Sequence, residues 1–188
     1  MNSNHKGLIV LVVINIIISG TIFLLPAHDQ LYIIYKFAYS NYSAFYSAIT
    51  YSVIHSSVNH LSTNMLFLAA YGYFLEPLIG TKKFLWLYGV AAILSVVVFQ
   101  LIVDLPIPCV GASGAVCAIL GASLFLRKIP NVLTILLLFF IVTETAKSFM
   151  DIRDGVAHLA HTIGFVIGIL FMLINYGKTI FTFQFRRF

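Results

Sequence analysis

Charged residues are scarce in this 188-residue chain: Asp, Glu, Lys and Arg together make up 9% of it. Soluble proteins carry about 25% charged residues, which keep their surfaces hydrated. Here 61% of the residues are hydrophobic, and the mean hydropathy is +1.01. This composition excludes an ordinary soluble domain and predicts an all-α protein of the lipid bilayer. The length suits a single domain over residues 1–188.

Cysteine is also scarce. Cys109 and Cys117 are expected in a loop and in a helix, which argues against a disulfide between them, and their spacing matches no metal-binding pattern. We therefore expect no metal and no organic cofactor. The formal net charge of +5 comes from 11 Lys and Arg residues that lie between apolar segments and form no patch, so we expect no nucleic-acid partner.

Long apolar runs dominate what is present. A bilayer-crossing helix needs about 20 apolar residues, and the sequence predicts six such spans. They lie at about 8–25, 61–79, 84–103, 113–126, 132–150 and 156–176. Because these runs recur to residue 176 and the first lacks a convincing cleavage site, we do not expect a secreted protein with a removable leader. Residues 30–59, rich in Tyr, Phe and Ser, are predicted to be an amphipathic loop with helical pieces at the membrane interface.

Positive charge predicts the orientation, because Lys and Arg accumulate on the cytoplasmic side of membranes. With both termini inside, the inner residues are Lys6, Lys82, Lys83, Arg127, Lys128, Lys178, Arg186 and Arg187. The outer ones are Lys36, Lys147 and Arg153, and the outer acidic residues are Asp29, Asp104, Asp151 and Asp154. We expect an integral multi-pass protein of the inner (plasma) membrane, with both termini cytoplasmic.

Three polar clusters interrupt the apolar segments. They are His55 with residues 60–64, residues 111–114, and residues 158–164 with Gly168. A polar group at membrane depth is costly, roughly 2.5–3.5 kcal/mol for a central charge, so it indicates a functional site. The clusters place a Ser, a His and an Asn on three different segments. These side chains can serve as a nucleophile, a general base and an oxyanion donor.

Counting along the helices places the three groups at one depth. His161 and Asn64 lie 15 residues before Tyr176 and Ile79, where their spans end, and Ser113 lies 15 residues before the inner marker Lys128. At 1.5 Å rise per residue, each is about 22 Å above the inner boundary of a hydrocarbon core about 30 Å thick. The three should therefore share a layer about 8 Å below the outer surface, and the site should face the outer side.

Small residues on two of the segments favour close helix packing. Gly164 and Gly168 share a face with His161, while Gly114, Ala118 and Ala122 form a ridge on the segment that begins at Ser113. Small faces allow membrane helices to approach backbone to backbone.

With these motifs the chain resembles the rhomboid family of intramembrane serine proteases, over nearly its whole length. The matching motifs are His60-x-x-x-Asn64 preceded by His55, Gly111-x-Ser113-Gly114, Ala160-His161-x-x-Gly164-x-x-x-Gly168, and Gly72-x-x-x-Glu76-x-x-x-Gly80. The resemblance implies a six-helix bundle with a long first outer loop. It also implies cleavage of single-span membrane proteins through an acyl-enzyme.

The resemblance further implies roles for particular residues. Ser113 would be the nucleophile and His161 its base, in a dyad without a carboxylate. Asn64, His60 and the Ser113 backbone N–H would stabilise the oxyanion. From the residues themselves, a serine at a helix N-terminus suits developing negative charge, and Gly111 and Gly114 let a substrate backbone approach.

Two positions depart from the family pattern. Cys117 stands where many relatives have a Tyr that packs on the catalytic imidazole, so the orientation of His161 is open and a compensating aromatic could lie elsewhere. Tyr46 and Ser47 stand where a Trp-Arg pair is common, so the first outer loop could be anchored differently.

The remaining polar residues have simpler interpretations. His158 is the alternative base, but the glycine spacing favours His161, and we expect His158 to line a water-accessible mouth. We expect His55 to support the outer loop by hydrogen bonds, Glu76 to be a buried acid satisfied by loop donors, and Glu144 to pair with Lys147 at i+3.

Two other functions compete with proteolysis. A catalytically inactive relative would bind membrane clients without cutting them, but such proteins lack the serine or the histidine that this chain keeps. A small transporter would spread polar residues through the bilayer, whereas here they cluster in one layer, and no internal repeat is evident. The sequence leaves the natural substrate and the oligomeric state open.

Overall fold

A computed structural model describes residues 5–103, 108–126, 129–150 and 156–185 of the chain, and the side chains of the last range only to residue 177. Within these ranges the protein is helical and contains no named strand. The helices are α1 (Lys6–Phe23), α2 (Ala27–Phe37), α3 (Ser47–Thr50), η1 (Tyr51–Val53), α4 (Val58–Ile79), α5 (Thr81–Val103), α6 (Ser113–Ser123), α7 (Asn131–Phe149) and α8 (His158–Phe185).

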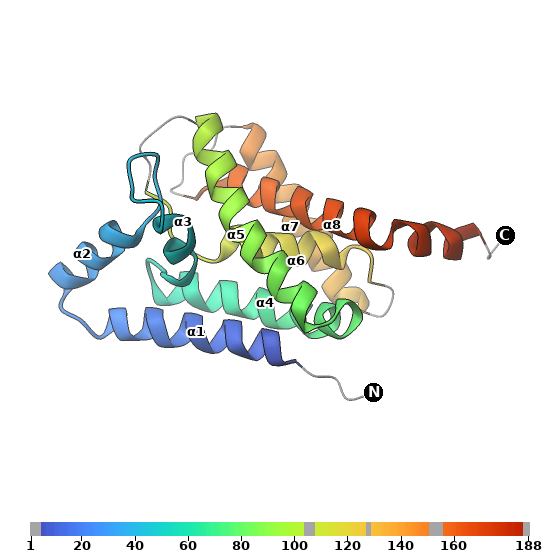
Figure 1. The fold of residues 1–188 in the computed structure, drawn as a ribbon, viewed down its shortest axis with the longest axis horizontal. Helices are drawn as coiled ribbons and strands as arrows, with labels where there is room; N and C mark the ends of the chain where they lie inside the picture. The colour runs from blue at the N-terminus through green and yellow to red at the C-terminus, as the bar shows by residue number, and fades with distance from the viewer. Residues whose placement is uncertain (1–4, 104–107, 127–128, 151–155, 186–188) are drawn as a thin grey trace.

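The helices form a bundle around α6 (Figure 1). In this view α1 and α4 lie alongside each other, α5 crosses in front, and α7 and α8 complete the bundle. All residues of α6 after Ser113 are buried, because the helix is short, small and apolar on every side. The beginning of α1 and the end of α8 lie at the same end of the bundle, whereas α2 and α3 lie at the other.

Each of the six predicted apolar segments contains a helix, with ends that differ by at most three residues, except that α8 continues to Phe185, nine residues beyond the predicted end. Of the described helices, α1, α5, α7 and residues 158–177 of α8 are long and apolar enough to cross a membrane. Two predicted spans are not among them: α4, although it has 22 residues, and α6, which has only 11. The beginning of α4 is set by Ser57, whose hydroxyl accepts a hydrogen bond from the His60 N–H and caps the helix.

The loop between α1 and α4 contains the helical pieces α2, α3 and η1, as predicted. Its helix α2 buries none of its residues, and Tyr32 and Tyr35 are exposed on it. The loop is anchored by backbone hydrogen bonds in both directions between Tyr39 and Cys109, at 3.0 and 2.8 Å. Tyr51 adds a hydrogen bond from its hydroxyl to the Ala92 carbonyl on α5. Backbone pairing and one buried tyrosine therefore hold the loop against the bundle.

Glu76 ties three helices together, but its partners differ from the loop donors that the sequence suggested. Its two carboxylate oxygens accept hydrogen bonds from the backbone N–H groups of Gly7 and Leu8, both at 2.8 Å, and from the Thr81 hydroxyl at 2.7 Å. The Glu76 side chain is fully buried. A carboxylate is well placed there, because the first turn of α1 has unsatisfied N–H groups and the positive end of the helix dipole.

The closest helix contact joins α6 and α8, backbone to backbone. A Cβ atom built on Gly164 would overlap the carbonyl oxygen of Gly114, and one built on Gly168 would overlap that of Ala118. In the other direction, a Cβ on Gly121 would overlap the carbonyl oxygen of Phe165. The small faces of both helices are therefore needed for this approach, as the sequence indicated.

We predict that Gly168→Ala destabilises the protein by about 1–3 kcal/mol, because the added methyl overpacks a backbone contact. The matched control is Gly89→Ala on α5, where a Cβ meets no atom within 4 Å. The measurement is the midpoint of thermal unfolding in detergent, followed by circular dichroism. Equal midpoints for the two variants would contradict the contact between α6 and α8.

Candidate functional site

Ser113 is the first residue of α6 and is half-buried. The turn before it depends on Gly111, whose φ of 111° lies in the region that favours glycine. The Gly111 N–H donates to the Tyr51 carbonyl at 2.8 Å, which fixes the turn to the loop between α1 and α4. The first N–H groups of α6 have no acceptor within the helix, so this turn can stabilise negative charge near the Ser113 hydroxyl.

His60 covers this turn from α4. A Cβ on Gly111 would overlap the His60 imidazole, so glycine is required there for space as well as for conformation. The ring centroids of His55 and His60 are 5.0 Å apart in an edge-on arrangement. Two of the sequence-predicted histidines therefore lie beside the residues that precede Ser113.

His55 links the Ser113 turn to α1. The backbone N–H of Ala112 donates to His55 Nε2 at 3.4 Å, which leaves the proton on Nδ1, 3.0 Å from the Ser19 hydroxyl. Ser19 in turn donates to the Val53 carbonyl at 3.0 Å. Burial, and secondarily the charge of His60, lowers the pKa of His55 from 6.5 to about 3. The ring is therefore neutral and acts as a structural support, as the sequence indicated.

Asn64 is buried near the site, with 5% of its surface exposed. Its side-chain NH₂ donates to the His60 carbonyl at 2.9 Å, one turn earlier on α4. An amide nitrogen has two protons, so this bond leaves the second available for another acceptor.

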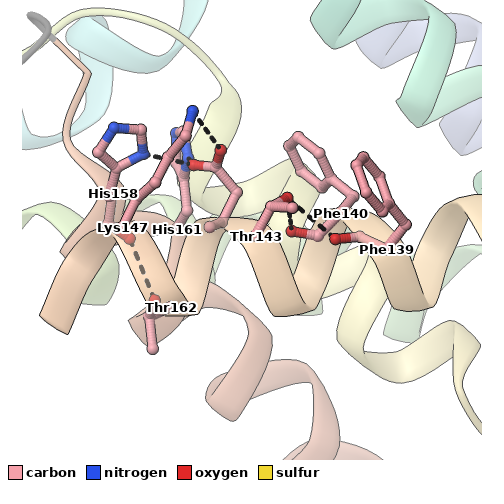
Figure 2. A network of polar contacts seen from close by, with 8 residues as sticks. Phe139, Phe140, Thr143, Lys147, His158, His161 and Thr162 are labelled. Carbon is pink, nitrogen blue, oxygen red and sulfur yellow. Dashed lines mark hydrogen bonds and ion pairs between the residues drawn. The ribbon is translucent and has the colours of Figure 1, made fainter. Parts of the chain in front are cut away.

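His161 lies in the first turn of α8, and its strongest contact comes from a different helix. Its Nδ1 is 2.5 Å from Oε2 of Glu144 on α7. The exposed fractions are 8% for His161 and 6% for Glu144. Figure 2 shows the His161 and His158 rings on α8, with Lys147 of α7 beside them. Glu144 therefore contacts a residue that the sequence marked as the base.

His158 shares the same carboxylate oxygen. Its Nδ1 lies 2.8 Å from Glu144 Oε2, and its ring meets the His161 ring edge-on at a centroid distance of 6.2 Å. Only 3% of His158 is exposed, so the expectation that it lines a water-accessible mouth is wrong. The predicted pair between Glu144 and Lys147 is present at 3.8 Å, on the other oxygen, Oε1.

Ser113 and His161 are brought near each other by the contact between α6 and α8. Gly164, one turn after His161, faces the carbonyl of Gly114, the residue after Ser113. His60 lies within electrostatic range of His161. Among the described residues, the Ser113 hydroxyl makes no hydrogen bond to the His161 ring. Catalytic hydrogen bonds are often long in the absence of substrate. The neighbouring positions of Ser113 and His161 therefore still permit a proton to pass from the hydroxyl to the ring.

One group of side chains has the composition of a metal site. Glu144, His158 and His161 each offer one ligand atom, and these atoms lie within 4.8 Å of one another. Two imidazoles and a carboxylate are suitable ligands for Zn²⁺. However, both Nδ1 atoms lie at hydrogen-bond distance from the same carboxylate oxygen, which is the arrangement of two donors sharing one acceptor.

Comparison with known proteins agrees with these motifs. The model of the Rhomboid domain matches residues 42–178, which include α3 to α7 and most of α8. The chain belongs to the rhomboid family. It is an integral membrane protein, as its apolar helices also indicate.

A more distant comparison involves a plant member of the family. The rhomboid chain is 26% identical over 179 residues to Rhomboid-like protein 11, chloroplastic, of Arabidopsis thaliana. The match covers 86% of this chain and 62% of that protein, so the chain spans less than two thirds of the length of this relative.

The contact between Glu144 and the two histidines was not predicted from the sequence. The available signal was an isolated carboxylate in the apolar segment 131–149, near its C-terminal end. Part of the orientation prediction lies outside the described residues, namely Asp104, Arg127, Lys128, Asp151, Arg153, Asp154, Arg186, Arg187 and the side chain of Lys178.

We predict that neutral His55 makes the stability of this rhomboid pH-dependent. His55 binds a proton at about pH 6.5 in the unfolded chain but only at about pH 3 in the folded chain. The free energy of unfolding is therefore unaffected by this group above pH 6.5, and it decreases as the pH falls below that value. Between pH 6.5 and pH 3 the free energy of unfolding of the wild type should fall by about 1.4 kcal/mol per pH unit more than that of His55→Gln. Denaturant unfolding in detergent at pH 7, 6, 5 and 4 measures the difference, and equal slopes for both proteins would refute it.

Proposed function

We propose that this rhomboid is an intramembrane serine endopeptidase, with Ser113 as nucleophile and His161 as general base. The observation that carries the proposal is the contact of α6 with α8 at Gly114 and Gly164. It sets the N-terminus of the helix that carries Ser113 against the first turns of the helix that carries His161. A helix N-terminus next to a buried imidazole suits the formation of an oxyanion by an attacking hydroxyl.

The chemistry follows from these groups. The Ser113 oxygen attacks the carbonyl carbon of a peptide bond while its proton moves to Nε2 of His161. The Ser113 N–H, His60 and the free proton of the Asn64 amide stabilise the oxyanion. The carbon–nitrogen bond then breaks, and His161 returns the proton to the leaving amine. A water molecule, deprotonated by His161, hydrolyses the acyl-enzyme, releases a carboxylic acid and restores Ser113.

The proposed substrates are single-span membrane proteins, whose peptide bond must leave the helical conformation to reach Ser113. The proposed orientation has both termini in the cytoplasm and the site towards the outer side. Two features support it: the beginning of α1 and the end of α8 lie at one end of the bundle (Figure 1), and His161 lies at the opposite end of α8.

We predict that Ser113→Ala and His161→Ala each abolish cleavage of a single-span test substrate by the purified protein in detergent, because each removes a reacting group. Ser123→Ala, on the same helix but at its far end, is the matched control and should retain activity. Product is measured by gel electrophoresis and mass spectrometry. Reaction of Ser113 with a fluorophosphonate provides a second measurement.

Three outcomes would contradict the proposal. Cleavage that survives Ser113→Ala would exclude Ser113 as nucleophile. The wild type could bind the substrate without cutting it, and the bound substrate could fail to protect a reactive Ser113 from the fluorophosphonate. These two results together would indicate an inactive, client-binding relative. Activity in His161→Ala together with inactivity in His158→Ala would exchange the roles of the two histidines.

A further inference from the structure

The contact between α7 and α8 suggests a third member of the proposed site. His161 Nδ1 lies 2.5 Å from Glu144 Oε2, and both side chains are buried. We propose that Glu144 is a positioning residue, which holds His161 in the orientation and tautomer that a base for Ser113 requires. This inference rests on the proposed function. It replaces the dyad implied by the family resemblance with a system of Ser113, His161 and Glu144.

Glu144 determines which nitrogen of the His161 ring carries the proton. An ionised carboxylate only accepts hydrogen bonds, so the Nδ1 of a neutral His161 must carry the ring proton. The lone pair is then left on Nε2, the nitrogen that can remove a proton from a serine hydroxyl. Without the carboxylate the two tautomers would compete, and the ring could also rotate.

Glu144 also lies beside the positive charge that His161 acquires during the reaction. When His161 takes the serine proton it becomes positive, and Glu144 is the acidic group in contact with it. Opposite charges attract more strongly in a buried site than in water, so this carboxylate would stabilise the positively charged ring during the reaction. The same role is played by the aspartate of soluble serine proteases, which orients the histidine without taking its proton.

A surface ion pair with Lys147 does not explain why Glu144 is buried. The Lys147 ammonium lies 3.8 Å from Oε1, and 40% of its side chain is exposed. Such exposed pairs contribute little to stability. The shorter contacts, at 2.5 and 2.8 Å, join Oε2 to the two buried histidines. A buried carboxylate is costly without donors, and the two imidazoles supply them.

With Glu144 as its partner, His161 can be oriented without an aromatic side chain at position 117. Cys117 is buried and lies within electrostatic range of Glu144. Its small side chain faces Gly164 on α8. The His161 ring thus contacts a carboxylate from α7 and the edge-on ring of His158. A hydrogen bond takes the place that ring packing has in many relatives.

Kinetics of Glu144→Gln provide the test, with Glu144→Asp as the conservative variant and Lys147→Ala as the matched control. Gln keeps the size of the side chain but removes its charge, so kcat for the single-span substrate should fall by up to about 10⁴-fold with little change in KM, as for loss of the orienting carboxylate elsewhere. Glu144→Asp should recover part of kcat, because it retains a charged acceptor. Lys147→Ala should resemble the wild type.

Nitrogen NMR of protein labelled with ¹⁵N-histidine gives a readout that is independent of activity. The His161 signals, assigned by comparison with His161→Ala, should show a single tautomer protonated at Nδ1 in the wild type and a mixture of tautomers in Glu144→Gln. This measurement also applies if Glu144→Gln folds poorly, because Glu144→Asp should then retain the wild-type tautomer.

Three outcomes would overturn the positioning role. They are wild-type kcat in Glu144→Gln, a His161 protonated at Nε2 in the wild type, and loss of wild-type activity with EDTA followed by recovery with Zn²⁺, which would make the three residues a metal site. The first and second leave the proposed protease intact as long as Ser113→Ala is inactive. Absence of Ser113-dependent cleavage in the wild type would instead refute the proposed function, while the NMR result would still report on the Glu144 contact.

Discussion

The approach of α6 to α8 is the constraint on which the rest of the structure depends. Gly164 and Gly168 on one helix face the carbonyl oxygens of Gly114 and Ala118 on the other, with no space for a side chain between them. In a bilayer this contact gains nothing from exclusion of water, so packing of small residues must stabilise it. Any larger residue would separate the helices and with them Ser113 and His161.

Buried polar groups connect this central pair to the surrounding helices. Glu76 joins the beginning of α1 to α4 and α5 through backbone N–H groups and the Thr81 hydroxyl. His55 joins Ser19 of α1 to the turn before Ser113. Each of these groups would be costly in an apolar interior if it lacked a partner, so they specify one arrangement of the helices rather than merely adding to stability.

Much of the fold could be predicted because helices in a bilayer must be apolar over their length, and each predicted segment contains a helix. The glycine faces were also predictable from their spacing. The partners of Glu76 and Glu144 were not, because periodicity shows which face a residue occupies but not which helix lies opposite. Glu76 bonds to residues 68 and 69 positions away, and Glu144 contacts a histidine 17 positions away on the next helix. Local spacing revealed only the weaker pair with Lys147.

Of the four described helices that are long and apolar enough to cross a membrane, the one that supplies Glu144 is the least buried in the protein. Of the nineteen residues of α7, all of them described, only Leu137 and Glu144 are buried. A hydrogen bond as short as the one to His161 tolerates little stretching, so a sideways drift of about 1 Å by α7 would weaken it sharply. A change in bilayer thickness, in lateral pressure of the lipid or in the polypeptides that contact α7 would therefore act mechanically on an imidazole carried by the neighbouring helix.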